Sequence, residues 1–183
     1  MARWTTPKKR KDLRSFLGFA SYYRRFVPGF AQTAAPLHQL TAEISEKGKK
    51  KNSTITSERW NGECQKAFDD LRTALTTAPV LAYPDFFKPF IVETDASDKG
   101  LGAVLSQKKD GKLRVIAYAS RGLRGAERNM KNYSSMKLEL LALKWTVTEK
   151  FCEYLLESEF VVYTDNNPLT YLQSKSKLKG DEQ

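Results

Sequence analysis

Cysteine, histidine and long apolar runs are all scarce in this sequence. Its two cysteines, Cys64 and Cys152, do not have metal-ligand spacings, which argues against a disulfide framework and against a thiolate metal site. The one histidine, His38, lies in a basic helical segment, so no Ser–His–Asp arrangement is indicated. No apolar run is long enough to span a bilayer, and no signal-peptide pattern opens the chain. We therefore expect an intracellular protein, cytoplasmic or nuclear, with reduced thiols and no membrane partner.

Positive charge, by contrast, is abundant and is concentrated near the N-terminus. The formal net charge is +10 over 183 residues. Residues 1–59 hold 13 Lys or Arg against 4 Asp or Glu, whereas residues 60–183 hold 18 against 17. This asymmetry indicates a polyanion partner, for which nucleic acid is the obvious candidate. The alternative is a solvated basic surface, or a nuclear-localisation-like run at residues 8–11.

The first 57 residues are expected to be helical and basic. Apolar spacing predicts a helix over 12–26, which Pro28 and Gly29 end, and a second short helix over 31–40. Residues 42–57 are polar and Lys-rich and are expected to form a flexible loop. Tyr22 and Tyr23 could stack on a nucleic-acid strand, or at least one of them is core. The basic residues expected to contact nucleic acid are Lys8, Lys9, Arg10, Lys11, Arg14, Arg24 and Arg25.

The rest of the chain changes from helical to α/β periodicity. A connecting helix is expected over 56–78, with Ser57 as its N-cap. An antiparallel three-strand meander is expected next, then a long helix over 134–157 and a fourth strand that lies parallel to the first strand or to another strand of the same sense. The expected strands are residues 90–94, 101–107, 113–119 and 159–164, and a last helix begins near residue 167. The long helix is expected to pack on the sheet through Met136, Leu140, Leu143, Val147, Phe151 and Tyr154.

Two of these strands end in the same way. Residues 90–97 (FIVETDAS) and 160–167 (FVVYTDNN) are apolar runs closed by Thr, Asp and small polar residues. If the two strands are parallel neighbours, Asp95 and Asp165 end about 5 Å apart. The long helix carries one acid, Glu139, just outside its apolar stripe. Alone, each aspartate is more often an Asx turn or helix cap, and such a glutamate is more often solvated.

Taken together, the three acids predict a metal site. Converging carboxylates repel one another unless cations neutralise them, and hard oxygen ligands favour Mg²⁺ or Mn²⁺. Two such ions about 4 Å apart can clamp a phosphodiester. The residues thus predict a two-metal site formed by Asp95, Glu139 and Asp165, which would be both metal ligands and catalytic groups.

Several strings along the chain resemble a known family. The chain is similar to the segment of gypsy-type LTR-retrotransposon Pol polyproteins that joins the end of reverse transcriptase to RNase H. The strings are residues 13–26 (LRSFLGFASYYRRF), 68–84, 90–97, 102–107 (GAVLSQ), 117–121 (AYASR), 139–143 (ELLAL) and 164–169 (TDNNPL). The resemblance implies a thumb-like segment at 1–57, a connecting helix at 58–83 and an RNase H-like mixed sheet with packed helices at 84–183.

The resemblance also implies an activity and its partners. Such domains hydrolyse the RNA strand of RNA–DNA hybrids with Mg²⁺ or Mn²⁺, and the rest of a Pol polyprotein is a further expected partner. Family members continue with another strand, another helix and a fourth carboxylate, whereas this sequence stops at Gln183. The chain alone is therefore expected to be weakly active or inactive. The alternatives are a non-catalytic nucleic-acid-binding or protein-interaction module derived from a retrotransposon, and a structural remnant without activity.

Overall fold

A computed structural model describes residues 4–47, 54–77, 81–129 and 134–164. The chain divides into a first unit, Met1–Val80, and a second unit, Leu81–Gln183. The expected last helix, near residue 167, lies outside the described residues. The finer division into 1–57, 58–83 and 84–183 stays a prediction.

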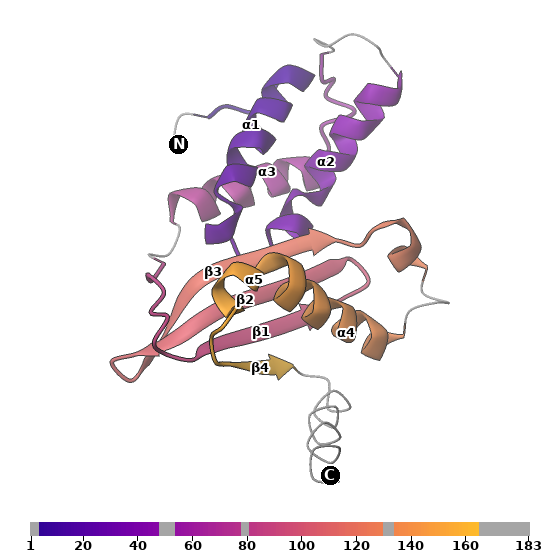
Figure 1. Ribbon diagram of the computed structural model, residues 1–183. Helices are drawn as coiled ribbons and strands as arrows, with labels where there is room; N and C mark the ends of the chain where they lie inside the picture. The colour runs from indigo at the N-terminus through magenta and orange to yellow at the C-terminus, as the bar shows by residue number, and fades with distance from the viewer. Residues whose placement is uncertain (1–3, 48–53, 78–80, 130–133, 165–183) are drawn as a thin grey trace, which may run out of the picture. The chain divides into compact units, whose positions relative to one another are not determined.

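The first unit is built from three helices around one apolar core (Figure 1). They are α1 (Arg10–Tyr22), α2 (Phe30–Lys47) and α3 (Gly62–Thr76), and a 3₁₀ turn, η1 (Arg24–Phe26), follows α1. Rings from α1 and α3 meet in the core, with the centroids of Phe16 and Phe68 4.7 Å apart. The segment expected to act as a connecting helix therefore supplies α3 to the core of this unit.

Two helix boundaries in this unit differ from those expected. The α2 helix continues past residue 40 because Ile44 extends the buried stripe of Leu37 and Leu40 by one further turn. The α3 helix begins at Gly62, not near residue 56, because the Asn61 side chain accepts a hydrogen bond from the Cys64 N–H at 2.9 Å. The prediction of Ser57 as N-cap was therefore wrong.

The described part of the second unit contains a four-stranded mixed sheet. Its strands are β1 (Phe90–Ala96), β2 (Gly100–Lys109), β3 (Lys112–Gly122) and β4 (Phe160–Thr164), in the order β3-β2-β1-β4. The first three form an antiparallel meander, and β4 pairs parallel to β1. Asp110 and Gly111 make the β2–β3 turn with φ of 52° and 71°, as the Asp-Gly signal predicts. The predicted mixed sheet, an antiparallel three-strand meander with a parallel fourth strand, is confirmed.

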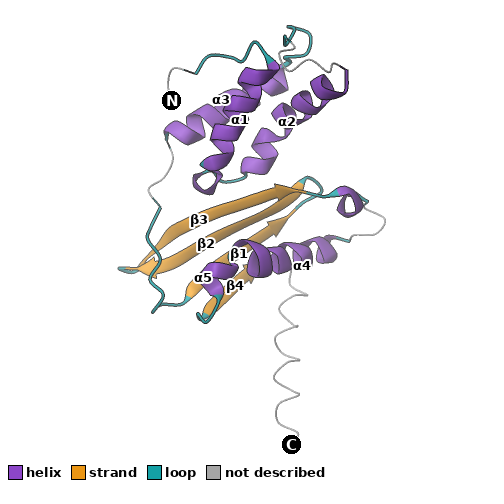
Figure 2. Ribbon diagram, turned by 45° about the horizontal axis from the view of Figure 1, so that its top comes forward, coloured by secondary structure: helices purple, strands orange, loops and turns teal. Residues whose placement is uncertain are grey.

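The helical layer lies over one face of this sheet (Figures 1 and 2). It comprises α4 (Ser135–Trp145), a π-helical turn (Thr146–Lys150) and α5 (Cys152–Leu155), so the single helix expected over 134–157 was wrong. A short 3₁₀ turn, η2 (Gly125–Arg128), lies between β3 and α4. Within the described ranges, no helix has both the length and the apolar character to cross a membrane.

The helix face that packs on the sheet also differs from the expected stripe. Met136 and Leu140 are 46% and 41% exposed. The residues of α4 that are buried are Leu138, Glu139, Ala142 and Trp145. Because this segment carries apolar residues on two faces, periodicity alone could not choose between them. The small Ala142 lets the helix approach the sheet, and the π-helical turn then changes the phase so that Phe151 and Leu155 are buried.

Candidate functional site

Glu139, on α4, is a buried acid whose carboxylate lies against the end of β1. Its side chain is 4% exposed, and it lies among the apolar residues of α4 that face the sheet. One carboxylate oxygen, Oε1, accepts a hydrogen bond from the backbone N–H of Ala96 at 3.1 Å. This contact, across 43 residues of sequence, fixes the carboxylate beside the last residue of the strand. A solvated glutamate at the stripe edge, the alternative from sequence, is thereby excluded.

Asp95 precedes that amide by one residue. Thr94 and Val92 are buried toward the core, whereas Asp95 and Glu93 alternate with them and are exposed. Glu139, on α4, therefore reaches the end of β1 from the helical layer, at the amide next to Asp95, whose side chain is exposed. Asp95, on β1, and the carboxylate of Glu139, on α4, thus both lie at the same end of β1. Asp95 is exposed to solvent.

The prediction that Asp95 and Asp165 lie close together requires β1 and β4 to be parallel neighbours. The strands are parallel neighbours, and their described register ends with Thr94 opposite Thr164. Each of these threonines is followed directly by one of the two aspartates in the sequence. Asp165 itself lies outside the described residues. Among the residues that the structure does describe, no three His, Cys, Asp or Glu side chains gather as a possible metal site.

A compact ion pair joins the end of β3 to the 3₁₀ turn η2 that precedes α4. Arg121, near the end of β3, donates two hydrogen bonds to Glu127, at 2.6 and 3.0 Å, with both side chains about 14% exposed or less. The Arg121 guanidinium also lies over the Trp145 ring, 5.5 Å from its centroid. The hydrogen bonds from Arg121 are the main cause that holds the pKa of Glu127 below its ordinary value. Arg121 thereby links β3 both to the 3₁₀ turn before α4 and to Trp145, the last residue of α4.

The Arg121–Glu127 pair was not predicted from the sequence. Arg121 closes the string AYASR, and Glu127 also accepts a hydrogen bond from the Arg124 N–H at 2.7 Å, three residues before it. A glutamate three residues after the N-cap position is typical of a helix start, and this spacing is the local feature of the sequence that marks Glu127. The pairing of Arg121 with Glu127 needed the fold, because it joins a strand to a 3₁₀ turn.

The basic residues expected to contact nucleic acid all lie in the first unit. Six of them are exposed, namely Lys8, Lys9, Lys11, Arg14, Arg24 and Arg25, and Arg10 is half-buried. The Arg25 guanidinium lies over the Phe26 ring at 5.8 Å. Tyr22 is 79% exposed and its ring meets that of the half-buried Tyr23 edge-on at 5.0 Å. This unit therefore presents both cations and an aromatic side chain to solvent.

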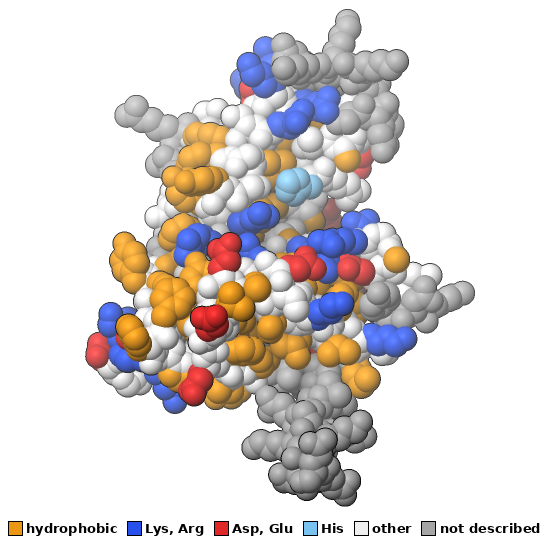
Figure 3. All heavy atoms as spheres, in the orientation of Figure 1, with side chains coloured by type: hydrophobic (Ala, Val, Ile, Leu, Met, Phe, Trp, Pro, Cys, Tyr) orange, Lys and Arg blue, Asp and Glu red, His pale blue; other side chains and the backbone are white. Residues whose placement is uncertain are grey.

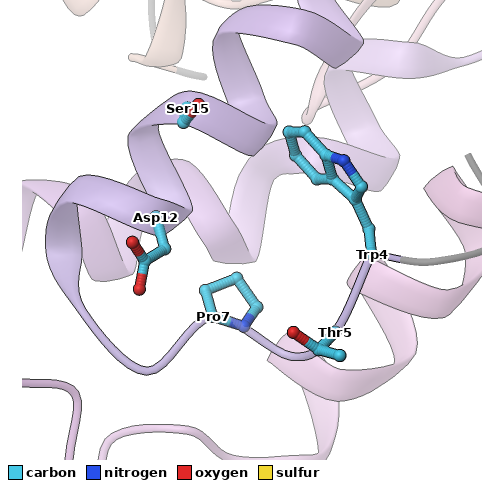
Figure 4. Close-up of a pocket in the computed structure, with 5 residues that line it drawn as sticks. All are labelled: Trp4, Thr5, Pro7, Asp12 and Ser15. Atoms are coloured by element: carbon cyan, nitrogen blue, oxygen red, sulfur yellow. The ribbon is translucent and has the colours of Figure 1, made fainter.

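The first unit also has a hollow of about 260 Å³, and none of these basic residues lines it (Figure 4). Trp4, Thr5, Pro7, Asp12 and Ser15 line it, and in the close-up Asp12 and Ser15 come from α1 while the others come from the extended segment before it. Asp12 accepts a hydrogen bond from the Lys9 N–H at 3.1 Å, so its carboxylate caps the start of α1. The hollow is a feature of the helix start.

Comparison with known proteins places the chain in a family. A model described as "RNase H-like domain found in reverse transcriptase" matches residues 60–162. The chain belongs to this family. In Drosophila melanogaster it is 39% identical over 166 residues to the retrovirus-related Pol polyprotein from transposon opus, a match that covers 90% of the chain and 16% of that relative. It is 40% identical over 161 residues to the polyprotein from transposon gypsy, covering 87% of the chain and 15% of that relative.

Solved structures give the same fold for this RNase H-like chain. A foamy viral protease-reverse transcriptase in complex with double-stranded DNA matches 94% of the chain and 28% of its own length, with a TM-score of 0.75 and 24% identity. Another, in complex with an RNA/DNA hybrid, matches with a TM-score of 0.72 and 24% identity, covering 100% of the chain and 23% of that protein. The chain thus spans about one sixth of the length of the curated relatives named above. The resemblance inferred from the sequence is confirmed.

Proposed function

We propose that the second unit hydrolyses the RNA strand of RNA–DNA hybrids, with Asp95, Glu139 and Asp165 as its catalytic carboxylates. The observation that carries this proposal is the buried Glu139 carboxylate, which is held by the amide that directly follows Asp95. A buried acid is retained at a cost in stability, so its placement at the solvent-exposed end of a strand favours a chemical role.

The donor set fits a hard divalent cation. Carboxylate oxygens are the ligands that Mg²⁺ and Mn²⁺ prefer, and the register of β1 with β4 ends at the two threonines that directly precede Asp95 and Asp165 in the sequence. Asp95, Glu139 and Asp165 would hold the metal. When bound, divalent ions supply activation of water and neutralisation of charge on a phosphodiester.

The chain's own residues then have distinct tasks. The Ala96 N–H keeps the Glu139 carboxylate in one orientation, so little reorganisation is needed when a cation or substrate arrives. Asp95 is exposed and can meet a substrate directly. The exposed cations of the first unit would bind phosphates of the duplex without regard to sequence. The complexes of the foamy viral proteins with double-stranded DNA and with RNA/DNA hybrid support a duplex as the ligand.

The test is hydrolysis of a labelled RNA–DNA hybrid with Mg²⁺ or Mn²⁺. Asp95→Asn is expected to lower the rate by about 100-fold or more, because it removes a carboxylate from the charge-stabilising set. Glu93→Gln is the matched control, since Glu93 is exposed on the same strand and the same pleat two residues earlier. Its rate is expected to stay within about twofold of wild type. Equal loss in both variants, or cleavage that persists in Asp95→Asn, would overturn the assignment.

A second candidate function is a nucleic-acid-binding module without catalysis. The observation that favours it is the set of exposed cations in the first unit, which does not depend on the carboxylates. In that case the wild-type chain would bind the hybrid with an affinity that falls steeply with salt, and no product would form at any Mg²⁺ or Mn²⁺ concentration.

A further inference from the structure

A second basic surface with exposed aromatic rings lies in the second unit, away from the carboxylates. The segment before β1 presents Tyr83 and Phe87, which are 92% and 100% exposed, and Phe86, which is 55% exposed. The tip of the β2–β3 hairpin, residues 108–114, adds four exposed cations and Leu113, which is 50% exposed. We call the three rings and this hairpin tip the ring–hairpin surface. Figure 3 shows blue side chains gathered at the lower left, over the hairpin turn of Figure 1, with orange side chains beside them.

Hydrogen bonds hold the rings next to the hairpin. The Gln107 side chain, 4% exposed, accepts a hydrogen bond from the Asp85 N–H at 2.9 Å. It also donates to the carbonyls of Asp85 and Lys88, at 2.8 and 2.9 Å. The Ala82 N–H donates to the Val115 carbonyl at 2.8 Å. Because the contacts come from β2 and β3, the turn at 85–88 is fixed against the base of the hairpin.

The turn also has internal order. The Phe87 N–H donates to an Asp85 carboxylate oxygen at 3.2 Å, and the Lys88 ammonium pairs with the other oxygen at 3.3 Å. Phe86 packs edge-on against Phe90, with ring centroids 5.8 Å apart. Phe86 thus anchors the turn, and Tyr83 and Phe87 are left facing solvent. Rings fixed in this way bind flat partners without first losing backbone freedom.

Charge and shape together select the partner. The hairpin tip carries Lys108, Lys109, Lys112 and Arg114 against one acid, Asp110. Cations beside exposed aromatic rings match a chain of phosphates that carries unpaired flat bases. A duplex keeps its bases stacked inside and cannot offer them to Tyr83 or Phe87.

We infer that the ring–hairpin surface binds single-stranded nucleic acid, with bases stacked on Tyr83 and Phe87 and phosphates on the hairpin cations. This site is distinct from the proposed catalytic one. The segment joins the start of β1, and Asp95 lies near the other end of that seven-residue strand. At about 3.3 Å a residue, the two sites are separated by about 20 Å along the sheet. The inference does not depend on the proposed hydrolysis.

The experiment measures binding of labelled oligo-dT and of a blunt DNA duplex to the full chain by fluorescence anisotropy. Tyr83→Ala with Phe87→Ala is expected to weaken oligo-dT binding by about tenfold or more, since each stacked base accounts for about fivefold or more. Duplex binding is expected to stay within about twofold. The control is Leu156→Ala, because Leu156 is also an exposed apolar side chain of this unit, 70% exposed. It is expected to change neither.

A charge series tests the second half of the inference. Lys109→Gln with Lys112→Gln should reduce the slope of log affinity against log salt for oligo-dT by about 0.7 for each phosphate that the variant no longer neutralises. Lys144→Gln, an exposed lysine of α4, is the matched control and should leave the slope unchanged. The Asp95→Asn variant should bind oligo-dT like wild type, so failure of the hydrolysis proposal is recorded separately.

Three results would overturn the inference. Unchanged oligo-dT affinity in the double ring variant is the first. Equal loss of oligo-dT and duplex binding is the second, because it would mean that stacking is not involved. The third is a double ring variant whose loss of oligo-dT binding is fully accounted for by its loss of stability in urea, because the rings would then pack against protein.

Discussion

Replacing Glu139 in two different ways separates its structural contact from its charge. Glutamine has the same shape and keeps an oxygen that can accept from the Ala96 N–H, but it carries no charge. Alanine removes both the acceptor and the buried Cγ methylene. The pair of variants therefore asks whether the contact at 3.1 Å is formed and whether the carboxylate is there for chemistry.

The expected magnitudes follow from the burial of the side chain. Leaving a partly buried N–H without an acceptor costs about 1–3 kcal/mol. Removing the buried Cγ methylene costs about 0.8 kcal/mol more. Glu139→Ala should therefore lower the free energy of unfolding of the second unit by about 2–4 kcal/mol. In Glu139→Gln, the free energy of unfolding of this unit should lie within about 1 kcal/mol of the wild-type value or above it, because a buried charge has been removed. Hydrolysis should be lost in both.

Native-state amide hydrogen exchange is the suitable assay, because the chain has two units and a single unfolding transition is not assured. Slowly exchanging amides of β2 report the opening free energy of the second unit alone. The reasoning is refuted if Gln destabilises this unit as much as Ala. It is also refuted if Ala costs less than about 0.5 kcal/mol, since that is the range of an ordinary surface change.

Three further predictions follow from other contacts. The folded pKa of Glu127 is lowered, so its pairing with Arg121 stabilises the protein above the ordinary carboxyl value of 4.5 and is lost as pH falls through the folded pKa. Urea unfolding against pH should show this acid-side loss in wild type and less of it in Glu127→Gln. Gln107→Ala should destabilise the second unit by about 2 kcal/mol or more, because it removes three hydrogen bonds, and amides at 85–88 should exchange faster. Lys11→Gln with Arg14→Gln should weaken duplex binding for all sequences alike and reduce its salt slope by about 0.9 for each phosphate no longer neutralised; strong sequence dependence would contradict this.

Much of the fold could be predicted because local signals and topology agree. The three-strand meander and the crossover through a helix were predicted, and β4 is parallel as expected; its neighbour, which the crossover leaves open, is β1. The boundary errors have two causes. Asn61 starts α3 by capping it, and Ile44 carries the apolar stripe of α2 into a polar stretch that resembles a loop in composition.

The candidate site was predictable in its residue types and less so in its geometry. The β1 strand follows from sequence, and the parallel sense of β4 follows from the crossover rule, whereas its pairing with β1 needed the fold. The burial of Glu139 could not be predicted from the sequence, because α4 has apolar residues on two faces. The face that packs on the sheet is the one that includes Glu139. The Arg121–Glu127 pair joins two neighbouring elements of different type, and the Gln107 contacts reach back 19 and 22 residues. No helix or strand periodicity marks either set of contacts.

The most direct test of the shared carboxylate site uses Mn²⁺ as a paramagnetic probe in NMR spectra of the full chain. The account predicts that low Mn²⁺ concentrations broaden the amide signals of Ala96 and Thr164 first. Asp95→Asn and Asp165→Asn should each abolish that broadening, while Glu93→Gln should leave it unchanged. Broadening that persists in both aspartate variants, or that appears elsewhere while the Ala96 signal stays sharp, would contradict the claim that these acids hold a common cation.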